Sequence, residues 1–265
     1  MFGVAQQRIL GHKIGMCDDR LAKYVVPLFY RIPEWFQMLN WRVNRWLGNK
    51  AYGAARCVYV DEATESAIGR GINQFVNLGA GVDTRLHRMS FPSGVKLFEV
   101  DTQASQTIKL QLLPSEHLNS DVQFVTCDFE TESWIDKLGA SGFEIEQPVF
   151  IIWEGVSMYL TRGALLDSIT QFGRLAPGSV IVLDFFDKPE DRATRGAIKM
   201  MDWINEPMHS LFDAAELEKM AQETSIEVTD LMDANSITTA FMTHVDGKPI
   251  GVCFPVAHFA TLTVA

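Results

Sequence analysis

Two glycines and a set of acidic residues are the parts of this sequence best suited to chemistry. Gly79 and Gly81 follow an apolar run at residues 75–78, and Asp101 ends a second such run at residues 96–101. Glycines let the N–H groups of a turn approach a ligand, and a carboxylate at the next strand end accepts hydrogen bonds from ribose hydroxyls. The pattern predicts a nucleoside-binding site.

Two further acids follow apolar runs in the same way. Asp128 comes after residues 122–125, and Glu154 ends the run at residues 149–153. In a parallel sheet the carboxyl ends of the strands meet at one edge, and ligands bind there. We therefore expect the glycine turn and the acids to lie together.

The glycine turn departs from the dinucleotide-binding fingerprint, because Thr84 stands where that fingerprint has its third glycine. That glycine permits close helix–strand packing beneath a pyrophosphate, a demand that a phosphate-free ligand does not make. S-adenosylmethionine is such a ligand: Asp101 would accept from its ribose and Asp128 from its adenine amino group. Structural roles stay open, with Asp128 capping a turn and Glu154 neutralising an arginine.

Strands and helices must alternate to position these residues. Strands are predicted at residues 75–78, 96–101, 122–125, 149–153 and 180–185, with closing strands at 226–229 and 252–263 and a turn at Asp246-Gly247. Helices are expected after Thr102, with Ala104, Ile108 and Leu112 on one face; after Thr161, carrying Leu165, Ile169 and Phe172 and ending at Pro177-Gly178; and after Asp213, where Glu216 completes a capping box. The alternation predicts an α/β fold with a mostly parallel sheet and helices on both faces.

The chain divides into two predicted parts. Residues 1–70 show helical rather than strand-like spacing and are rich in aromatic residues, which suits a helical cap on the acceptor side of the site. Residues 71–265 form the binding core, and the polar, Met-rich stretch at residues 188–212 is interpreted as a helical insert or lid.

Composition narrows the functional classes. The 265 residues carry 33 acids against 23 bases, for a net charge of −10, whereas a general nucleic-acid binder needs an excess of Lys and Arg. The cysteines are scattered at positions 17, 57, 127 and 253, without zinc-ligand spacing or a disulfide framework, which favours a reducing, cytoplasmic setting. Neither a signal peptide nor a membrane span is expected. No metal site is expected either.

Several blocks together resemble the leucine carboxyl methyltransferase family, and within it the polyketide-tailoring O-methyltransferases. They are Ala55-Arg56 with Asp61, the NLGAGVDTR stretch at residues 77–85, FEVD at residues 98–101, Asp128, and EGVSMYL at residues 154–160. The similarity covers roughly residues 18–186. It implies a Rossmann-like class I methyltransferase fold with a seven-stranded sheet, an N-terminal helical cap, and S-adenosylmethionine as the methyl donor.

The resemblance also assigns residues by position. Arg56 matches the arginine that pairs with the donor's carboxylate, and Glu154 the acid near its methionine part. Gly79 and Gly81 match the glycine turn. The remaining matches are Asp101 to the ribose acid, Asp128 and Phe129 to the adenine contacts, and Lys23 to an N-terminal lysine that reaches the donor.

The function that follows is methyl transfer to a carboxylate or phenolic hydroxyl of a small metabolite, leaving S-adenosylhomocysteine. Tyr159 is a candidate contact with the acceptor, and His209 a candidate base for a phenol. Alternatives are a methyltransferase for protein C-terminal carboxylates, an NAD-type oxidoreductase, and a regulator that binds the cofactor without catalysis. The acceptor and the oligomeric state are not predicted.

Overall fold

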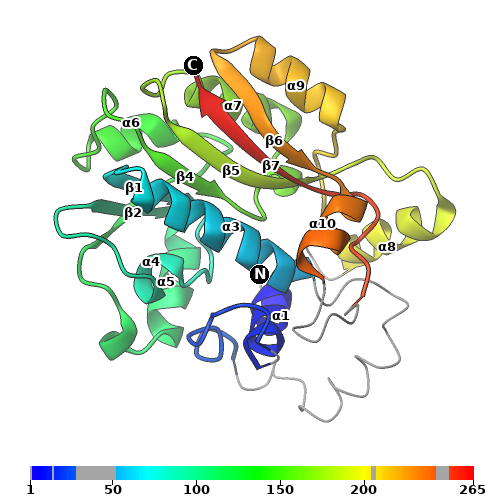
Figure 1. The fold of residues 1–265 in the computed structure, drawn as a ribbon, viewed down its shortest axis with the longest axis horizontal. Coiled ribbons are helices and arrows are strands. Elements are labelled where there is room, and N and C mark those ends of the chain that lie inside the picture. The colour runs from blue at the N-terminus through cyan, green and yellow to red at the C-terminus, as the bar shows by residue number, and fades with distance from the viewer. Residues whose placement is uncertain (1, 14, 28–51, 204–206, 243–250) are drawn as a thin grey trace.

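The helices are arranged around a single β-sheet that crosses the centre of the molecule (Figure 1). The structure is a computed structural model that describes residues 2–13, 15–27, 52–203, 207–242 and 251–265. Among these residues the sheet has seven strands in the order β3-β2-β1-β4-β5-β7-β6. The predicted α/β class with a mostly parallel sheet is confirmed.

All strands but one share a direction among the described residues. The strands are β1 (Gln74–Leu78), β2 (Lys96–Asp101), β3 (Val122–Thr126), β4 (Phe150–Trp153), β5 (Val180–Phe186), β6 (Ile226–Met232) and β7 (Ala257–Val264). β7 lies between β5 and β6 and runs antiparallel to both. β1 pairs with β2 on one side and with β4 on the other. The strand order therefore reverses between β1 and β4, and ligands of open α/β sheets bind at such a point.

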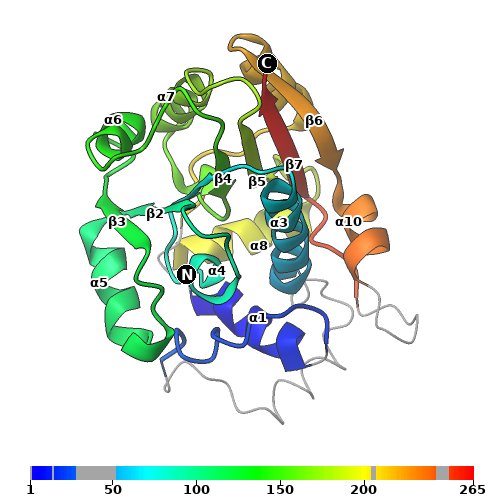
Figure 2. The ribbon, with the colours of Figure 1, turned by 60° about the vertical axis from the view of Figure 1, so that its left-hand side comes forward.

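Helices cover both faces of the sheet, as Figure 2 shows. On one face lie α6 (Trp134–Gly139), α7 (Arg162–Phe172) and α9 (Ala214–Gln222), which contribute to one buried apolar cluster. On the other lie α3 (Tyr52–Gly69), α4 (Arg85–Arg88) and α10 (Ala234–Phe241), which contribute to a second. α1 (Phe2–Lys13) packs against α3. Burial on both faces explains why every residue of β1, β4 and β5 is buried.

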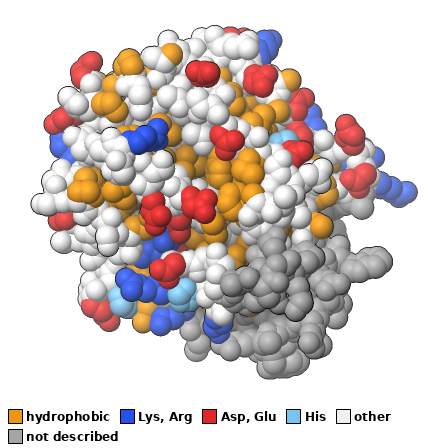
Figure 3. Space-filling model, viewed as in Figure 1, with side chains coloured by type: hydrophobic (Ala, Val, Ile, Leu, Met, Phe, Trp, Pro, Cys, Tyr) orange, Lys and Arg blue, Asp and Glu red, His pale blue; other side chains and the backbone are white. Residues whose placement is uncertain are grey.

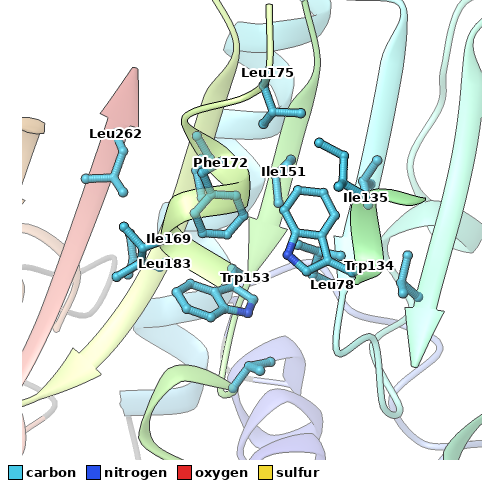
Figure 4. Close-up of a cluster of buried hydrophobic side chains, with 14 of the residues drawn as sticks. Leu78, Trp134, Ile135, Ile151, Trp153, Ile169, Phe172, Leu175, Leu183 and Leu262 are labelled. Atoms are coloured by element: carbon cyan, nitrogen blue, oxygen red, sulfur yellow. The ribbon is translucent and has the colours of Figure 1, made fainter. Parts of the chain in front are cut away.

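Large aromatic side chains fill the first of these clusters (Figure 4). The Phe172 ring lies 5.3 Å from that of Trp134 and 5.1 Å from that of Trp153, in the second case edge-to-face. Each such ring removed from water contributes about 2–3 kcal/mol before its lost side-chain entropy is counted. The core therefore fixes β4, and with it the position of the residues that follow Trp153.

The predicted inner face of α5 (Gln103–Leu112) is wrong. Ala104 and Ile108 are exposed, while the buried side chains are Gln106 and Lys109. Both reach specific partners: Gln106 Nε2 donates to the Val125 carbonyl at 2.9 Å, and Lys109 Nζ donates to Glu99 Oε1 at 2.5 Å. The spacing of apolar residues therefore predicted the wrong inner face of α5, because the polar side chains that are buried have hydrogen-bond partners on the sheet.

Other predicted boundaries are confirmed or shifted. Thr102, Thr161 and Asp213 cap helices as expected, and Asp213 forms the predicted capping box. α7 ends at Phe172 rather than at Pro177-Gly178, and α10 was not predicted. Among residues 188–203 and 207–212, which are the described part of the predicted lid, the structure has one helix, α8 (Arg192–Trp203). The aromatic residues at positions 28–51 and the predicted turn at Asp246-Gly247 lie outside the described residues.

The surface agrees with the acidic composition. Figure 3 shows acidic side chains spread over one face, around a group of hydrophobic side chains at its centre. Within the described part of the chain, no helix combines the length and the apolar character that crossing a bilayer requires.

Candidate nucleoside-binding site

The structure places the predicted site residues at one edge of the sheet. Gly79 follows β1, Asp101 ends β2, Asp128 lies two residues beyond β3, and Glu154 follows β4. These four strands are neighbours and run parallel, so their carboxyl ends face the same side. The expected juxtaposition is present.

A left-handed backbone conformation forms the glycine turn. Gly79 has φ of 71° and Gly81 has φ of 48°, a region that residues with a Cβ adopt only at a cost. A Cβ on Gly79 would lie 2.3 Å from Cγ2 of Val156. The turn after β1 and the turn after β4 therefore approach each other so closely that only glycine fits.

The N–H groups of this turn point into the protein. Gly79 N and Ala80 N donate to the Val100 carbonyl at 2.7 and 3.3 Å, and Gly81 N donates to Asp101 Oδ2 at 2.6 Å. The expectation that the N–H groups of both glycines are presented to a ligand is therefore wrong. A pyrophosphate requires such donors, so residues 79–81 do not form a phosphate cradle.

Asp101 is held rigidly from two sides. Oδ2 accepts from Gly81 N and Oδ1 from Thr102 N, each at 2.6 Å, and the residue is 8% exposed. A carboxylate has about four acceptor positions, so two remain after these bonds. Asp101 is a fixed, ionisable acceptor pair of the kind that vicinal hydroxyls match.

Asp128 and Phe129 lie in a tight turn beyond β3. Asp128 is exposed, and its Oδ1 accepts from Glu130 N at 3.0 Å. The turn-capping role that the sequence left open is therefore present, and it occupies one carboxylate oxygen. Phe129, the next residue, is half-buried and packs against the first apolar cluster.

Arg56, on α3, and Glu154 form an ion pair, with Arg56 Nε 2.9 Å from Glu154 Oε1. Arg56 Nη1 also donates to Asp184, and Glu154 Oε2 lies 2.6 Å from Arg85 Nη1. Glu154 thus neutralises arginines, which is the structural role that the sequence left open for it. Burial would lower the pKa of the Arg56 guanidinium, but Asp184 and Glu154 raise it well above its ordinary value.

Asp184 is a site residue that sequence reasoning missed. It lies within β5 and is 1% exposed. Its Oδ1 accepts from Gly155 N at 2.5 Å, and its Oδ2 accepts from the Tyr52 hydroxyl at 2.6 Å as well as from Arg56. The available signal was one acid inside an otherwise apolar, fully buried strand, because a buried charge needs a partner.

The blocks at Arg56–Asp61, residues 77–85 and Glu154 meet through Arg85, which is fully buried. Arg85 Nε donates to Asp61 Oδ1 at 2.7 Å, and Arg85 Nη1 contacts both Asp83 and Glu154. Burial would lower the pKa of Arg85, but the three carboxylates raise it well above its ordinary value. Segments far apart in sequence are thereby joined beneath the site.

The remaining candidates lie at the margin of this arrangement. Lys23 is exposed, with Nζ 4.8 Å from the centre of the Tyr24 ring; its neighbours Leu21 and Val25 pack in one cluster with Val82. Tyr159 is half-buried, and His209 is exposed with its backbone N–H donating to the Met158 carbonyl at 2.8 Å. Tyr159 and His209 therefore lie on adjoining segments beyond β4.

One family model matches this chain over more than half of its length. The sequence model of the leucine carboxyl methyltransferase family matches residues 4–172. A Bacillus subtilis protein named "Putative S-adenosyl-L-methionine-dependent methyltransferase YktD" is 29% identical over 72% of this chain and 66% of its own. A similarly named Frankia alni protein is 33% identical over 50% of this chain and 47% of its own. The chain thus spans between about half and two thirds of these relatives.

Solved structures match over nearly the whole chain. The crystal structure of a DUF574 family protein from Streptomyces avermitilis superposes with a TM-score of 0.66 at 16% identity, covering 98% of this chain and 97% of that one. At this identity the likeness shows a shared fold.

Proposed function

The chain belongs to the leucine carboxyl methyltransferase family, and from this premise we propose that it is a methyltransferase that uses S-adenosylmethionine. The observation that carries the proposal is the glycine turn, whose N–H groups at Gly79, Ala80 and Gly81 are bonded within the protein. This suits a nucleoside ligand without phosphates and weighs against NAD. The names of its relatives support the same donor.

The described residues fit the nucleoside half of the donor. Asp101 has two free acceptor positions at the end of β2, where they meet the two ribose hydroxyls. Asp128 keeps one oxygen without a turn bond for the adenine amino group. Phe129, which follows Asp128 and is half-buried, is the candidate aromatic contact for the adenine ring.

The charges fit the methionine half. We assign Arg56 to the donor's carboxylate, through guanidinium donors beyond those used by Glu154 and Asp184. In the network of described residues, four arginines face five carboxylates, namely Arg8, Arg56, Arg85 and Arg88 with Asp19, Asp61, Asp83, Glu154 and Asp184. The excess negative charge favours the donor's ammonium and sulfonium groups. Lys23 remains a candidate second partner of the carboxylate.

The donor supplies an activated methyl group on a sulfonium, so the protein's task is alignment. Contacts with the ribose and the methionine part would hold the sulfur and its methyl group in line with the acceptor oxygen. Positioning of this kind lowers the activation barrier by several kcal/mol. We propose an oxygen acceptor on a small metabolite. A carboxylate is ionised at neutral pH and needs no base, whereas a phenol with a pKa of about 10 needs one; His209 is the candidate, and Tyr159 a candidate wall of the acceptor pocket.

Calorimetric titration tests the donor. S-adenosylhomocysteine should bind to the full chain and NAD should not; binding of NAD without S-adenosylhomocysteine would reverse the assignment. Asp101→Asn is the matched variant for the same titration with S-adenosylhomocysteine, because it keeps the shape of the Asp101 side chain and removes its charge.

Methyl-labelled donor tests the acceptor. Label should enter the small-molecule fraction of a metabolite extract. A carboxyl ester releases labelled methanol in alkali and a phenol ether does not, so the two acceptor classes separate. Label confined to the protein fraction would favour a C-terminal carboxylate acceptor, as in the family's name. Donor binding without any labelled product would favour a non-catalytic regulator.

A further inference from the structure

The first helix presents one buried cation to the rest of the molecule. Ala5, Arg8 and Gly11 are buried at three-residue spacing on α1, and Arg8 is 2% exposed. A long charged side chain is rarely buried to this degree without partners. The partners of Arg8 therefore identify the segment to which α1 is attached.

Arg8 reaches the segment directly after the glycine turn. Its Nη2 donates to the Val82 carbonyl at 3.0 Å and its Nη1 to Asp83 Oδ1 at 3.2 Å. Asp83 in turn accepts from Arg85 N at 2.9 Å and from the Asn77 amide in β1 at 3.1 Å. The guanidinium fork thus joins α1 to both the backbone and a side chain of the turn.

Asp19 completes the attachment. It is 1% exposed, its Oδ2 lies 3.4 Å from Arg8 Nε, and its Oδ1 accepts from the Thr84 hydroxyl at 2.7 Å. The same oxygen accepts from Ala22 N at 2.9 Å, which orders the chain leading to Lys23. Arg8 and Asp19 together contact three consecutive residues, 82–84.

These contacts bear on the site because the turn is fixed from two directions. On one side, residues 79–81 are bonded to Val100 and Asp101 of β2. On the other, residues 82–84 are bonded to Arg8 and Asp19. Glycine backbones are conformationally permissive, so the position of Gly81 relative to Asp101 depends on both attachments.

We propose that Arg8, together with Asp19, is a positioning residue of the donor site, holding residues 79–84 in the donor-binding conformation. The inference rests on the proposed function. Arg8 acts through the turn. Because it orders the turn before the donor binds, donor binding does not carry the entropy cost of ordering it.

The test compares paired variants of the full chain. Arg8→Met combined with Asp19→Asn removes one buried charge of each sign, so the net charge of the network is unchanged, and Asp83 and Arg88 keep their contacts with Arg85 and Asp61. Arg8→Lys keeps the charge and loses the fork. Arg20→Met, an exposed arginine on the same segment, is the matched control. For each protein, calorimetry gives the Kd for S-adenosylhomocysteine, and hydrogen exchange of the unliganded protein reports on residues 79–84.

We expect the double variant to raise the Kd about tenfold and to speed exchange at residues 79–84, with the rest of the sheet protected as before. Arg8→Lys should fall between it and the wild type, and Arg20→Met should match the wild type. Unchanged exchange at residues 79–84 would overturn the inference whether or not the donor binds. A double variant whose Kd for S-adenosylhomocysteine equals that of the wild type would also overturn it. So would a double variant that loses protection from exchange throughout the sheet while its folded fraction keeps the wild-type Kd. A wild type that binds no S-adenosylhomocysteine would instead overturn the proposed function.

Discussion

Single side chains at the carboxyl edge belong both to the fold and to the proposed donor site, and Asp101 is the clearest case. Its two oxygens each accept one backbone N–H, from the turn after β1 and from the start of α5. The acid was predictable from its place at the end of an apolar run. Its backbone partners were not, because they depend on how residues 79–81 turn toward β2.

Replacing Asp101 should therefore affect binding more than folding. For Asp101→Ala we expect the Kd for S-adenosylhomocysteine to rise about tenfold to a hundredfold, because a charged acceptor of two hydroxyls is lost. The free energy of unfolding should fall by about 1–2 kcal/mol, since two N–H groups lose their partner. Calorimetry and urea unfolding measure the two effects. Donor affinity equal to that of the wild type would remove Asp101 from the site.

Asp83 should give the protein part of its stability against acid. Burial would raise the pKa of Asp83, but Arg85 and Arg8 outweigh burial and hold the pKa well below its usual range. A carboxyl with a depressed folded-state pKa stabilises the protein above its unfolded value, near 4, and this stabilisation is lost as the pH falls.

We expect Asp83→Asn to lower the free energy of unfolding by about 3 kcal/mol at neutral pH, because buried arginines lose a counter-charge. The difference in free energy of unfolding between the variant and the wild type should become smaller as the pH falls below about 5. Urea unfolding across a pH series measures it, with the exposed Asp121→Asn as control. A gap that stays constant down to about pH 3 would contradict the assignment.

At the scale of elements, periodicity predicted which segments fold and was less informative about which face turns inward. Three helix starts were predicted from their caps, because a cap depends on residues adjacent in sequence. The inner face of α5 was wrong because Lys109 and Gln106 find partners on β2 and β3. Partners distant in sequence cannot be read from the spacing of apolar residues.

Gly79 in the glycine turn and Gly94 in the turn before β2 form a matched pair for substitution. Gly79 and Gly94 both have positive φ, but a Cβ on Gly79 would lie 2.3 Å from Val156, whereas one on Gly94 would have nothing within 4 Å. Gly94→Ala should cost only the backbone strain, about 1–2 kcal/mol. Gly79→Ala should cost more than that and weaken donor binding. Equal losses of stability, with donor affinity retained, would show that the approach of Val156 is unimportant.

For the whole molecule, the fold class followed from alternating strands and helices, and the family resemblance implied its detailed form. The position of β7 between β5 and β6 could not be derived from the pattern, because any order of strands buries similar apolar runs. The site was predictable as a set of strand ends. Asp184 and Arg8 were not, since they act from within β5 and from α1 on residues far away in sequence.

Donor binding should protect the molecule along one edge. We expect S-adenosylhomocysteine to slow hydrogen exchange at residues 79–83, 101–102, 128–130 and 154–156, which end or follow four adjacent strands. Residues 70–73 and Gln147, which precede β1 and β4, should be unaffected because they lie at the opposite edge. Mass spectrometry of peptides gives this pattern. Protection confined to the opposite edge would place the ligand elsewhere.

The position of β7 has a consequence for how the chain is made. β5 and β6 are synthesised before β7, yet they do not pair with each other; β7 pairs with both. While the ribosome is still translating residues 257–264, the edge of β5 is uncovered and β6 has no place in the sheet. An uncovered apolar strand is a template for pairing with other chains. The interval between the synthesis of β6 and the synthesis of β7 is therefore one in which a nascent copy is exposed to aggregation and would benefit from a chaperone.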